Sequence, residues 1–202
     1  LLAENGCPFS TRRVVLGHLQ RGGSPSPEDR LRATQMGSAA VRAILAGQGD
    51  CVLAVIAGVE GPSYRPLGAM MACMPDGTRV GTLSSGCIEA DISLHAKEVL
   101  ADNAPRLIRY GAGSPFIDIE LPCGGGLDIL LLPRPDVGVL EQVDARRAAR
   151  DGCILVINMD NGALAIADTG ATMRDGATLS LRFDPDIRFL VFGKGPEAGT
   201  FS

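Results

Sequence analysis

The chain has 202 residues, of which 46% are hydrophobic, 21% are charged and 4% are aromatic, and its formal net charge is −4. No uninterrupted apolar run approaches the roughly 18 residues that suggest a membrane-spanning helix, so we expect no membrane span. The slightly acidic balance, the scattered arginines and the absence of tryptophan argue against a nucleic-acid partner. No charged-then-apolar leader opens the sequence, and we therefore expect a cytoplasmic protein.

The first predicted elements lie within residues 11–47, which begin TRRVVLGHLQRGG and continue into a helical pattern. A short strand is predicted at residues 14–16. Ser26 as N-cap and Pro27 at the first helical position predict the start of a helix, and the glycine at position 47 predicts its end. We expect this helix to cover one face of a sheet.

This front segment resembles the sugar-phosphate-binding part of bacterial-type 6-phosphofructokinases, through the pattern R-x-x-V-L-G-H-x-Q-R-G-G. The resemblance assigns contacts with fructose 6-phosphate to Arg12, His18 and Arg21, and two guanidinium groups with an imidazole can grip a phosphate. It ends near Gly49, and neither the ATP loop nor the catalytic aspartate loop of that family is found. A sugar-phosphate-binding fragment is therefore an alternative function, carried by residues 1–49.

The next element is an apolar run at residues 51–57, which predicts a strand, and the loop EGPSYRPLG follows at residues 60–68. Two prolines and two glycines make this a defined loop and not a helix. Tyr64 and Arg65 offer an aromatic face and a fixed cation, which suit a flat heterocycle that bears a phosphate. A solvated arginine on a surface loop is the alternative, and for Arg65 alone it is the better interpretation.

A short strand at residues 80–83 leads into Ser84-Ser85-Gly86-Cys87 and then into a helical pattern. Apolar residues follow at spacings of three and four, which predicts one buried helical face. These residues are Ile88, Ile92, Ala96 and Val99.

The position of Cys87 at a helix start predicts a reactive thiol, because unpaired N–H groups and the helix dipole lower a thiol's pKa and attract anions. Ser84 and Ser85 are good helix caps. Glu89 and Asp91 suit the dipole as well, but would compete with a bound anion. The alternative is a buried structural cysteine at a tight turn.

A second cysteine lies in a similar setting. The alternating run IDIEL at residues 117–121 predicts a half-buried strand, Pro122-Cys123-Gly124-Gly125-Gly126 follows, and residues 127–132 predict another strand. Glycines allow positive φ angles and close approach to a ligand, and successive N–H groups can form an anion nest. We predict that Cys123 lines the wall opposite Cys87, with a positive φ at Gly125. A flexible hairpin turn is the alternative.

Four motifs in this order resemble the xanthine dehydrogenase accessory family of XdhC/CoxI type: EGPSYRPLGAMM, DGTRVGTLSSGCIEAD, RYGAGSP and PCGGGLDILLLPRP. The family usually has two glycines before the first motif cysteine, where this chain has Ser85-Gly86. The resemblance implies a protein that holds the molybdenum–pterin cofactor, promotes its sulfuration and assists its insertion into an apo-enzyme. Such a protein is an accessory or chaperone rather than a turnover enzyme, so no catalytic residues are assigned.

The resemblance also implies the partners and the site. The partners are an apo-molybdenum hydroxylase and a sulfurtransferase, and Cys87 is a candidate molybdenum ligand because a thiolate is a soft ligand. The residues predicted to hold the molybdenum cofactor (molybdopterin) are Cys87, Cys123, Ser84, Ser85, Gly86, Tyr64, Arg65, Gly124 and Gly125.

Beyond Pro135 we predict a helix at residues 137–150, a strand at 153–159, a hairpin turn at Asn161-Gly162 and strands at 164–167 and 178–183. These strands are expected to complete the sheet of the central domain. The six cysteines show no CxxC pair, so no zinc site is predicted. We expect core positions for three of them: Cys51, Cys73 and Cys153.

The chain ends with the apolar strand 187–192 and the GxGxxA spacing of Gly193, Gly195 and Ala198, which is typical of the first turn of a dinucleotide-binding domain. A complete dinucleotide site needs the whole βαβ unit, so we do not expect this chain to bind NAD(P). The GxGxxA spacing still leaves a fragment of a nicotinamide-dependent oxidoreductase as a further alternative function. A strand without its sheet neighbours needs cover, which favours a homodimer.

The predicted fold class is α/β: a mixed sheet with flanking helices, plus the first strand and turn of a truncated Rossmann-like domain. The predicted domains are a phosphofructokinase-like segment at residues 1–49, a central XdhC/CoxI-type domain at 50–183 and the truncated Rossmann start at 184–202.

Overall fold

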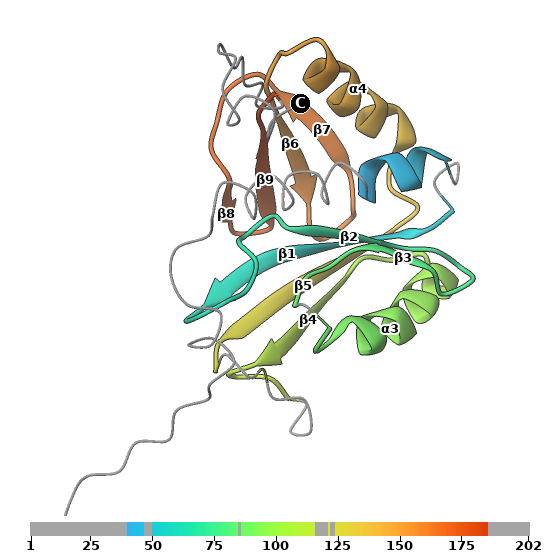
Figure 1. Ribbon diagram of the computed structural model, residues 1–202, viewed down its shortest axis with the longest axis vertical. Helices are drawn as coiled ribbons and strands as arrows, with labels where there is room; N and C mark the ends of the chain where they lie inside the picture. The colour runs from blue at the N-terminus through green and yellow to red at the C-terminus, as the bar shows by residue number, and fades with distance from the viewer. Residues whose placement is uncertain (1–39, 47–49, 85, 116–120, 122–123, 186–202) are drawn as a thin grey trace, which may run out of the picture.

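The fold was obtained as a computed structural model, which describes residues 40–46, 50–84, 86–115, 121 and 124–185. Within these ranges the chain forms two antiparallel sheets that share a core, together with two longer helices and the short helical segment 40–46 (Figure 1). None of the described helices is long and apolar enough to cross a membrane.

The larger sheet has five strands in the order β3-β2-β1-β5-β4, and each neighbouring pair is antiparallel. Its central strand pairs on both sides, so that Ala54 lies opposite Met71 on one neighbour and Leu131 on the other. The strands are β1 (Val52–Glu60), β2 (Met70–Cys73), β3 (Arg79–Gly81), β4 (Arg106–Gly111) and β5 (Gly126–Pro133).

Strand β1 is apolar over residues 52–57 because both faces of the sheet are covered there. Val52, Ala54 and Ile56 point to the face covered by helix α3, whereas Leu53 and Val55 point to a second core on the opposite face. A strand buried on both faces reads as a continuous apolar run rather than an alternating one. The predicted strand at residues 51–57 is confirmed and extends to the start of the glycine-containing loop.

Helix α3 (Glu89–Asp102) follows the predicted apolar face. Ile92, Ala96 and Val99 are buried against the larger sheet, as the spacing predicts. The helix ends at Asn103, which adopts a left-handed conformation with φ 50° and donates its N–H to the Val99 carbonyl oxygen at 2.9 Å. Asparagine is one of the few residues that accept this conformation at a helix end.

The second sheet contains strands from the last third of the described chain, in the order β7-β6-β9-β8. Helix α4 (Val137–Ala148) leads into it, and the predicted Asn161-Gly162 turn connects its first two strands. The bounds are β6 (Cys153–Asn158), β7 (Leu164–Ala167), β8 (Met173–Asp175) and β9 (Thr178–Phe183).

The predicted α/β class is confirmed, but the prediction of one mixed sheet is wrong for the described residues. The strands after residue 153 form their own sheet, and every described pairing is antiparallel. Apolar side chains such as Leu155 and Leu181 do not extend an edge of the first sheet. They pack in the same core as Leu53 and Leu130, against the face that α3 leaves open. Stacking the sheets buries more apolar surface than lengthening one of them.

The front segment contributes to this second core. Residues 40–46 are helical, and Ala40, Val41 and Ile44 are buried among residues of both sheets. The expected cover of a sheet face by this helix is therefore confirmed for these residues. The predicted strands at 14–16 and 187–192, and residues 117–120 of the strand predicted at 117–121, lie outside the described residues.

Candidate functional site

The predicted site residues gather at one edge of the larger sheet. Strands β1 and β4 end there and β5 begins there, so that Gly126 pairs with both Glu60 and Gly111 (Figure 1). We call residues 60–65, 111–114 and 124–126 the glycine cluster. We call residues 82–88, which connect β3 to α3 and carry Cys87, the thiol loop.

The thiol loop folds around the carboxylate of Glu89, the first residue of α3. Its Oε1 atom accepts hydrogen bonds from Thr82 Oγ1 at 2.6 Å, from the Leu83 N–H at 2.9 Å and from the Ser84 N–H at 2.8 Å. Its Oε2 atom accepts from Ser84 Oγ at 2.6 Å and from the Gly86 N–H at 2.9 Å. The carboxylate therefore replaces the water that this loop's donors would otherwise need.

These contacts lower the pKa of Glu89 although the residue is only 6% exposed. Burial alone would raise its pKa, but hydrogen bonds from the Ser84 and Thr82 side chains and from the loop backbone lower the pKa to about 2. Hydrogen bonds to the ionised form stabilise that form. Glu89 is therefore a carboxylate at every physiological pH.

The predicted cap residue Ser84 acts in a different way from a simple N-cap. The N-cap position is Ile88, whose side chain makes no capping bond, while Ser84 Oγ accepts from the Cys87 N–H at 3.0 Å and the Ile88 N–H at 3.1 Å. The N–H groups that we expected to attract an external anion are thus engaged by Glu89 and Ser84. Ser85 lies outside the described residues.

Cys87 itself is exposed, so the alternative of a buried structural cysteine is wrong. A surface hollow of about 370 Å³ lies beside its loop. The hollow is lined by Arg79, Gly81, Thr82, Gly86, Glu89 and Ala90. By contrast, Cys51, Cys73 and Cys153 are buried core residues, as predicted.

The glycine cluster is held by close backbone contacts. A Cβ atom on Gly125 would lie 2.0 Å from the Pro62 carbonyl oxygen and 2.9 Å from that of Glu60, so only glycine fits there. The prediction of a positive φ at Gly125 is wrong, since the left-handed conformation belongs to Gly124, with φ 75°. The close approach that the glycines were expected to allow is made to another loop of the chain.

Arg109 joins two segments of the glycine cluster to Asp128 of β5, and sequence reasoning missed it. Its Nε atom donates to the Ala112 carbonyl oxygen at 2.8 Å, its Nη1 atom to Asp128 Oδ1 at 3.1 Å, and its Nη2 atom forms an ion pair with Glu60. Asp128 also accepts from Arg174 of the second sheet at 3.2 Å. The sequence feature that could have indicated this role for Arg109 is an acidic residue near the facing ends of two other strands, Glu60 on β1 and Asp128 on β5.

The loop with Tyr64 and Arg65 closes on itself. Ser63 Oγ donates to the Arg65 carbonyl oxygen at 2.7 Å and accepts from the Arg65 N–H at 3.3 Å. Both Tyr64 and Arg65 are half-buried, and burial lowers the pKa of the Arg65 guanidinium. Arg65 is therefore not the fully solvated surface residue of the alternative interpretation.

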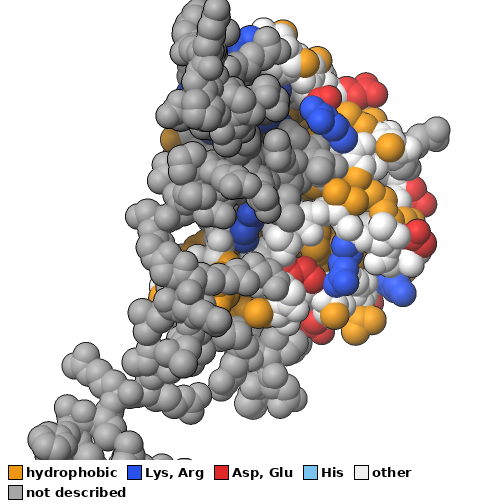
Figure 2. Space-filling view, in the orientation of Figure 1, with side chains coloured by type: hydrophobic (Ala, Val, Ile, Leu, Met, Phe, Trp, Pro, Cys, Tyr) orange, Lys and Arg blue, Asp and Glu red, His pale blue; other side chains and the backbone are white. Residues whose placement is uncertain are grey.

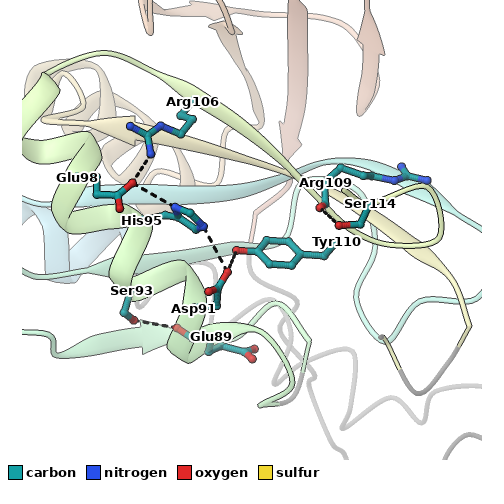
Figure 3. A network of polar contacts seen from close by, with 9 residues as sticks. All are labelled: Glu89, Asp91, Ser93, His95, Glu98, Arg106, Arg109, Tyr110 and Ser114. Carbon is teal, nitrogen blue, oxygen red and sulfur yellow. Dashed lines mark hydrogen bonds and ion pairs between the residues drawn. The ribbon is translucent and has the colours of Figure 1, made fainter. Parts of the chain in front are cut away.

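Polar contacts connect α3, which follows the thiol loop, to β4, and a separate contact lies where β4 enters the glycine cluster (Figure 3). The hydroxyl of the fully buried Tyr110 donates to Asp91 Oδ2 at 2.6 Å, and His95 Nε2 lies 3.5 Å from the same carboxylate oxygen. Ser114 Oγ donates to the Arg109 carbonyl oxygen at 2.7 Å. The contact between Tyr110 and Asp91 therefore joins β4, which leads into the glycine cluster, to α3, which follows the thiol loop.

The structure thus brings Gly125 to the loop of Tyr64, and ties α3, which follows Ser84, Gly86 and Cys87, to strand β4. Among the described residues, no group of three or more His, Cys, Asp or Glu side chains is arranged to hold a metal ion. Predicted site residues outside the described ranges are Ser85, Cys123, Arg12, His18, Arg21, Gly193, Gly195 and Ala198.

On the face seen in Figure 2, basic side chains of the described residues are interspersed with acidic and apolar ones. No broad basic field covers the described part of this face.

Comparison with known proteins gives two family matches. Residues 44–111 match the XdhC and CoxI family, and residues 1–44 match the phosphofructokinase family. Both resemblances predicted from the sequence are therefore confirmed, and the two matched segments meet at residue 44. This junction lies within the helical segment 40–46, whose apolar residues are buried in the shared core.

Individual relatives agree with this division. The molybdenum cofactor insertion chaperone PaoD of Escherichia coli K12 is 34% identical over 166 residues, which cover 79% of this chain and 50% of PaoD. An ATP-dependent 6-phosphofructokinase of Bacillus thuringiensis is 52% identical over 50 residues, which cover 24% of this chain and 16% of that enzyme. Only the first match reaches the candidate site.

A solved structure has the same fold. The crystal structure of a xanthine dehydrogenase from Bacillus halodurans matches with a TM-score of 0.58 and 25% identity, and the match covers 73% of this chain and 53% of that one. The chain therefore spans about half the length of this protein and of PaoD.

Proposed function

We infer the function from the match of residues 44–111 to the XdhC and CoxI family. We propose that the chain binds the molybdenum cofactor and takes part in its maturation and its insertion into a xanthine dehydrogenase-type molybdenum hydroxylase. The observation that carries the proposal is the 34% identity over 166 residues to a molybdenum cofactor insertion chaperone. The role proposed is that of an accessory protein, which acts in the cytoplasm.

The site at the sheet edge fits such a ligand in its chemistry. Cys87 offers an exposed thiol, whose thiolate is a soft ligand for molybdenum or a carrier of sulfur. We propose that the pterin part of the cofactor lies against the glycine cluster, where Tyr64 and Arg65 supply an aromatic ring and a cation. Cys123, Ser84, Ser85, Gly86, Gly124 and Gly125 complete the proposed site.

The proposed partners follow from this role. A protein that only holds and transfers the cofactor needs an apo-molybdenum hydroxylase to receive it. Sulfuration of the molybdenum centre needs a donor, and we propose a sulfurtransferase. We also retain the proposal of a homodimer, whose test is the molar mass measured in solution by light scattering.

The experiment that tests the function is cofactor retention by the Cys87→Ala variant. The wild-type chain, produced in cells that make the cofactor, is expected to co-purify with molybdenum and with a fluorescent molybdopterin oxidation product. Cys87→Ala should lose at least about tenfold of both, with little change in melting temperature because exposed side chains contribute little to stability. Cys87→Ser preserves the size of the side chain and should also lose the cofactor, since a hydroxyl is a harder ligand.

Two results would contradict different parts of this proposal. A wild-type chain that retains neither molybdenum nor molybdopterin would argue against the function itself. A Cys87→Ala variant that retains both at the wild-type level would leave the function in place, and would remove Cys87 from the site.

The phosphofructokinase-like front segment favours no second function. It matches 16% of the length of such an enzyme, and phosphoryl transfer needs ATP, a metal ion and a base held in line with the sugar hydroxyl. We predict no ATP-dependent phosphorylation of fructose 6-phosphate in a coupled assay. Turnover that disappears on Arg21→Ala would overturn this prediction. A nucleotide-induced rise in melting temperature would in turn support the oxidoreductase alternative.

A further inference from the structure

We propose that Glu89 is the positioning residue of the candidate site: its carboxylate holds the thiol loop in the shape that presents Cys87 to the cofactor. The identity of the ligand rests on the proposed function. The ordering of the loop by Glu89 rests on the contacts alone, so the two can be tested separately.

The first argument is the number of contacts made by one side chain. The Glu89 carboxylate accepts six hydrogen bonds, three at each oxygen, and all six donors come from the thiol loop. A carboxylate has about four lone-pair positions, so its capacity is filled by this one segment. The described contacts leave no donor from the rest of the protein on this carboxylate, which is therefore devoted to the loop.

The second argument is the path from Glu89 to Cys87. Ser84 Oγ donates to Glu89 Oε2 at 2.6 Å and accepts from the Cys87 N–H at 3.0 Å. Ser84 thus transmits the position of the carboxylate to the backbone of the cysteine. Because hydrogen bonds to ionised groups are shorter and stronger than neutral ones, the first step of this path is stiff.

The third argument is which residues of the loop face solvent. Leu83, Ser84 and Ile88 are buried, whereas Gly86 and Cys87 are exposed. A loop that served only to connect β3 with α3 would not need a buried charge at its centre. Here the buried part fixes the loop, and the exposed part carries the thiol.

The test compares Glu89→Gln with Glu98→Gln, a matched control that changes an exposed carboxylate on the same helix. A glutamine amide places an NH₂ group where one carboxylate oxygen accepted hydrogen bonds, so about half of the loop's donors lose their acceptor. Amide hydrogen exchange of residues 83–88 should become at least about tenfold faster in Glu89→Gln and stay unchanged in Glu98→Gln.

A second measurement reports on the thiol itself without any cofactor. Alkylation of Cys87 by iodoacetamide, followed by peptide mass spectrometry from pH 6 to 10, should be about three- to tenfold faster at pH 7 in Glu89→Gln. The substitution removes a negative charge, and releases N–H groups at the helix start that can stabilise a thiolate. Cofactor retention should nevertheless fall about tenfold, because a reactive thiol on a loose loop binds less well.

The outcomes separate this inference from the proposed function. Unchanged exchange and an unchanged alkylation profile in Glu89→Gln would overturn the inference, and so would faster exchange with wild-type cofactor retention. If the wild-type chain retains no cofactor, the proposed function fails, and exchange and alkylation still decide the role of Glu89. If Glu89→Gln does not fold, Ser84→Ala replaces it: exchange at Cys87 and Ile88 should accelerate, and wild-type rates there would overturn the inference.

Discussion

The thiol loop and the glycine cluster lie at the same edge of the sheet but are held by opposite means. The thiol loop is ordered by one charged side chain, Glu89, whose carboxylate accepts hydrogen bonds from Thr82, Leu83, Ser84, Gly86 and Ile88. The glycine cluster is ordered by the lack of a side chain, since Gly125 lets two backbone segments approach each other closely. The order of the thiol loop depends on the charge of Glu89 and therefore on pH. The order of the glycine cluster depends on the small volume of Gly125.

Charge is also present around the glycine cluster, but it plays a secondary part there. Arg109 reaches Glu60, Asp128 and the Ala112 carbonyl oxygen, and so ties the rim of the cluster together. Burial lowers the pKa of Arg109, but hydrogen bonds and attraction from Asp128 and Glu60 outweigh it and raise the pKa. Arginine stays charged at any pH that the fold survives, so the arginine side of this clamp does not titrate.

The largest effect is predicted for Gly125→Val. Its Cβ atom would lie 2.0 Å from the Pro62 carbonyl oxygen, so the loop of residues 60–65 has to move away from β5. We expect the free energy of unfolding to fall by about 2–4 kcal/mol and cofactor retention to be lost. Urea unfolding monitored by circular dichroism measures the first effect, and molybdenum content measures the second.

Gly138→Val is the control for Gly125→Val. Gly138 is exposed in the first turn of α4, and its Cβ would approach only the Asp136 side chain, at 3.3 Å. Its cost should stay below about 1 kcal/mol. Equal stability of Gly125→Val and the wild-type chain would show that the close backbone contact does not hold the cluster. If Gly125→Val is less stable but retains the cofactor normally, the glycines form only a structural turn and do not contribute to cofactor binding.

A smaller effect, specific to the thiol loop, is predicted for the pH dependence of stability. The folded pKa of Glu89 lies at about 2, below its ordinary 4.5, so the carboxylate stabilises the folded state fully above pH 4.5. This contribution, roughly 3 kcal/mol, is lost as the pH falls from 4.5 towards 2. Glu89→Gln should therefore be less stable than the wild-type chain at pH 7, and the difference should shrink at pH 3.

Measuring stability as a function of pH also distinguishes the thiol loop, held by charge, from the glycine cluster, held by close packing. Gly125→Val changes volume and not charge, so its stability difference from the wild-type chain should stay constant between pH 7 and pH 3. Other carboxylates also titrate in this range, which is why each variant is compared with the wild-type chain at the same pH. Parallel stability curves for Glu89→Gln and the wild-type chain would mean that the thiol loop is not held by charge.

Sequence patterns predicted the parts of the fold in which burial repeats regularly. The strand at residues 178–183 and the buried face of Ile92, Ala96 and Val99 follow from apolar periodicity, and the turn at Asn161-Gly162 follows from backbone preference. The division into two sheets could not be predicted from the sequence. Strand patterns show which side chains are buried, but they do not show which other element packs against them.

The site was predicted less completely, for two physical reasons. Glu89 was interpreted as a partner of the helix dipole and a competitor of bound anions, because the sequence does not show that its carboxylate turns back onto residues 82–88. Among consecutive glycines, the sequence does not distinguish Gly124, which has the positive φ, from Gly125, which makes the close approach. Both properties depend on the neighbouring loop, which is remote in sequence.

The smallest effect is predicted for Tyr110→Phe, which removes the hydrogen bond between β4 and α3. The hydroxyl donates to Asp91 Oδ2 at 2.6 Å, and the substitution keeps the buried ring (Figure 3). Loss of one hydrogen bond to a carboxylate should lower the free energy of unfolding by about 1–2 kcal/mol.

A double-mutant cycle with Glu89→Gln tests whether Glu89 alone holds the thiol loop. If it does, the loss of stability caused by Glu89→Gln should be the same, within about 0.5 kcal/mol, in the wild-type and Tyr110→Phe backgrounds. A coupling energy above about 1 kcal/mol in this double-mutant cycle would show that the thiol loop also depends on β4. The thiol loop and the glycine cluster would then have to be treated as one cooperative unit.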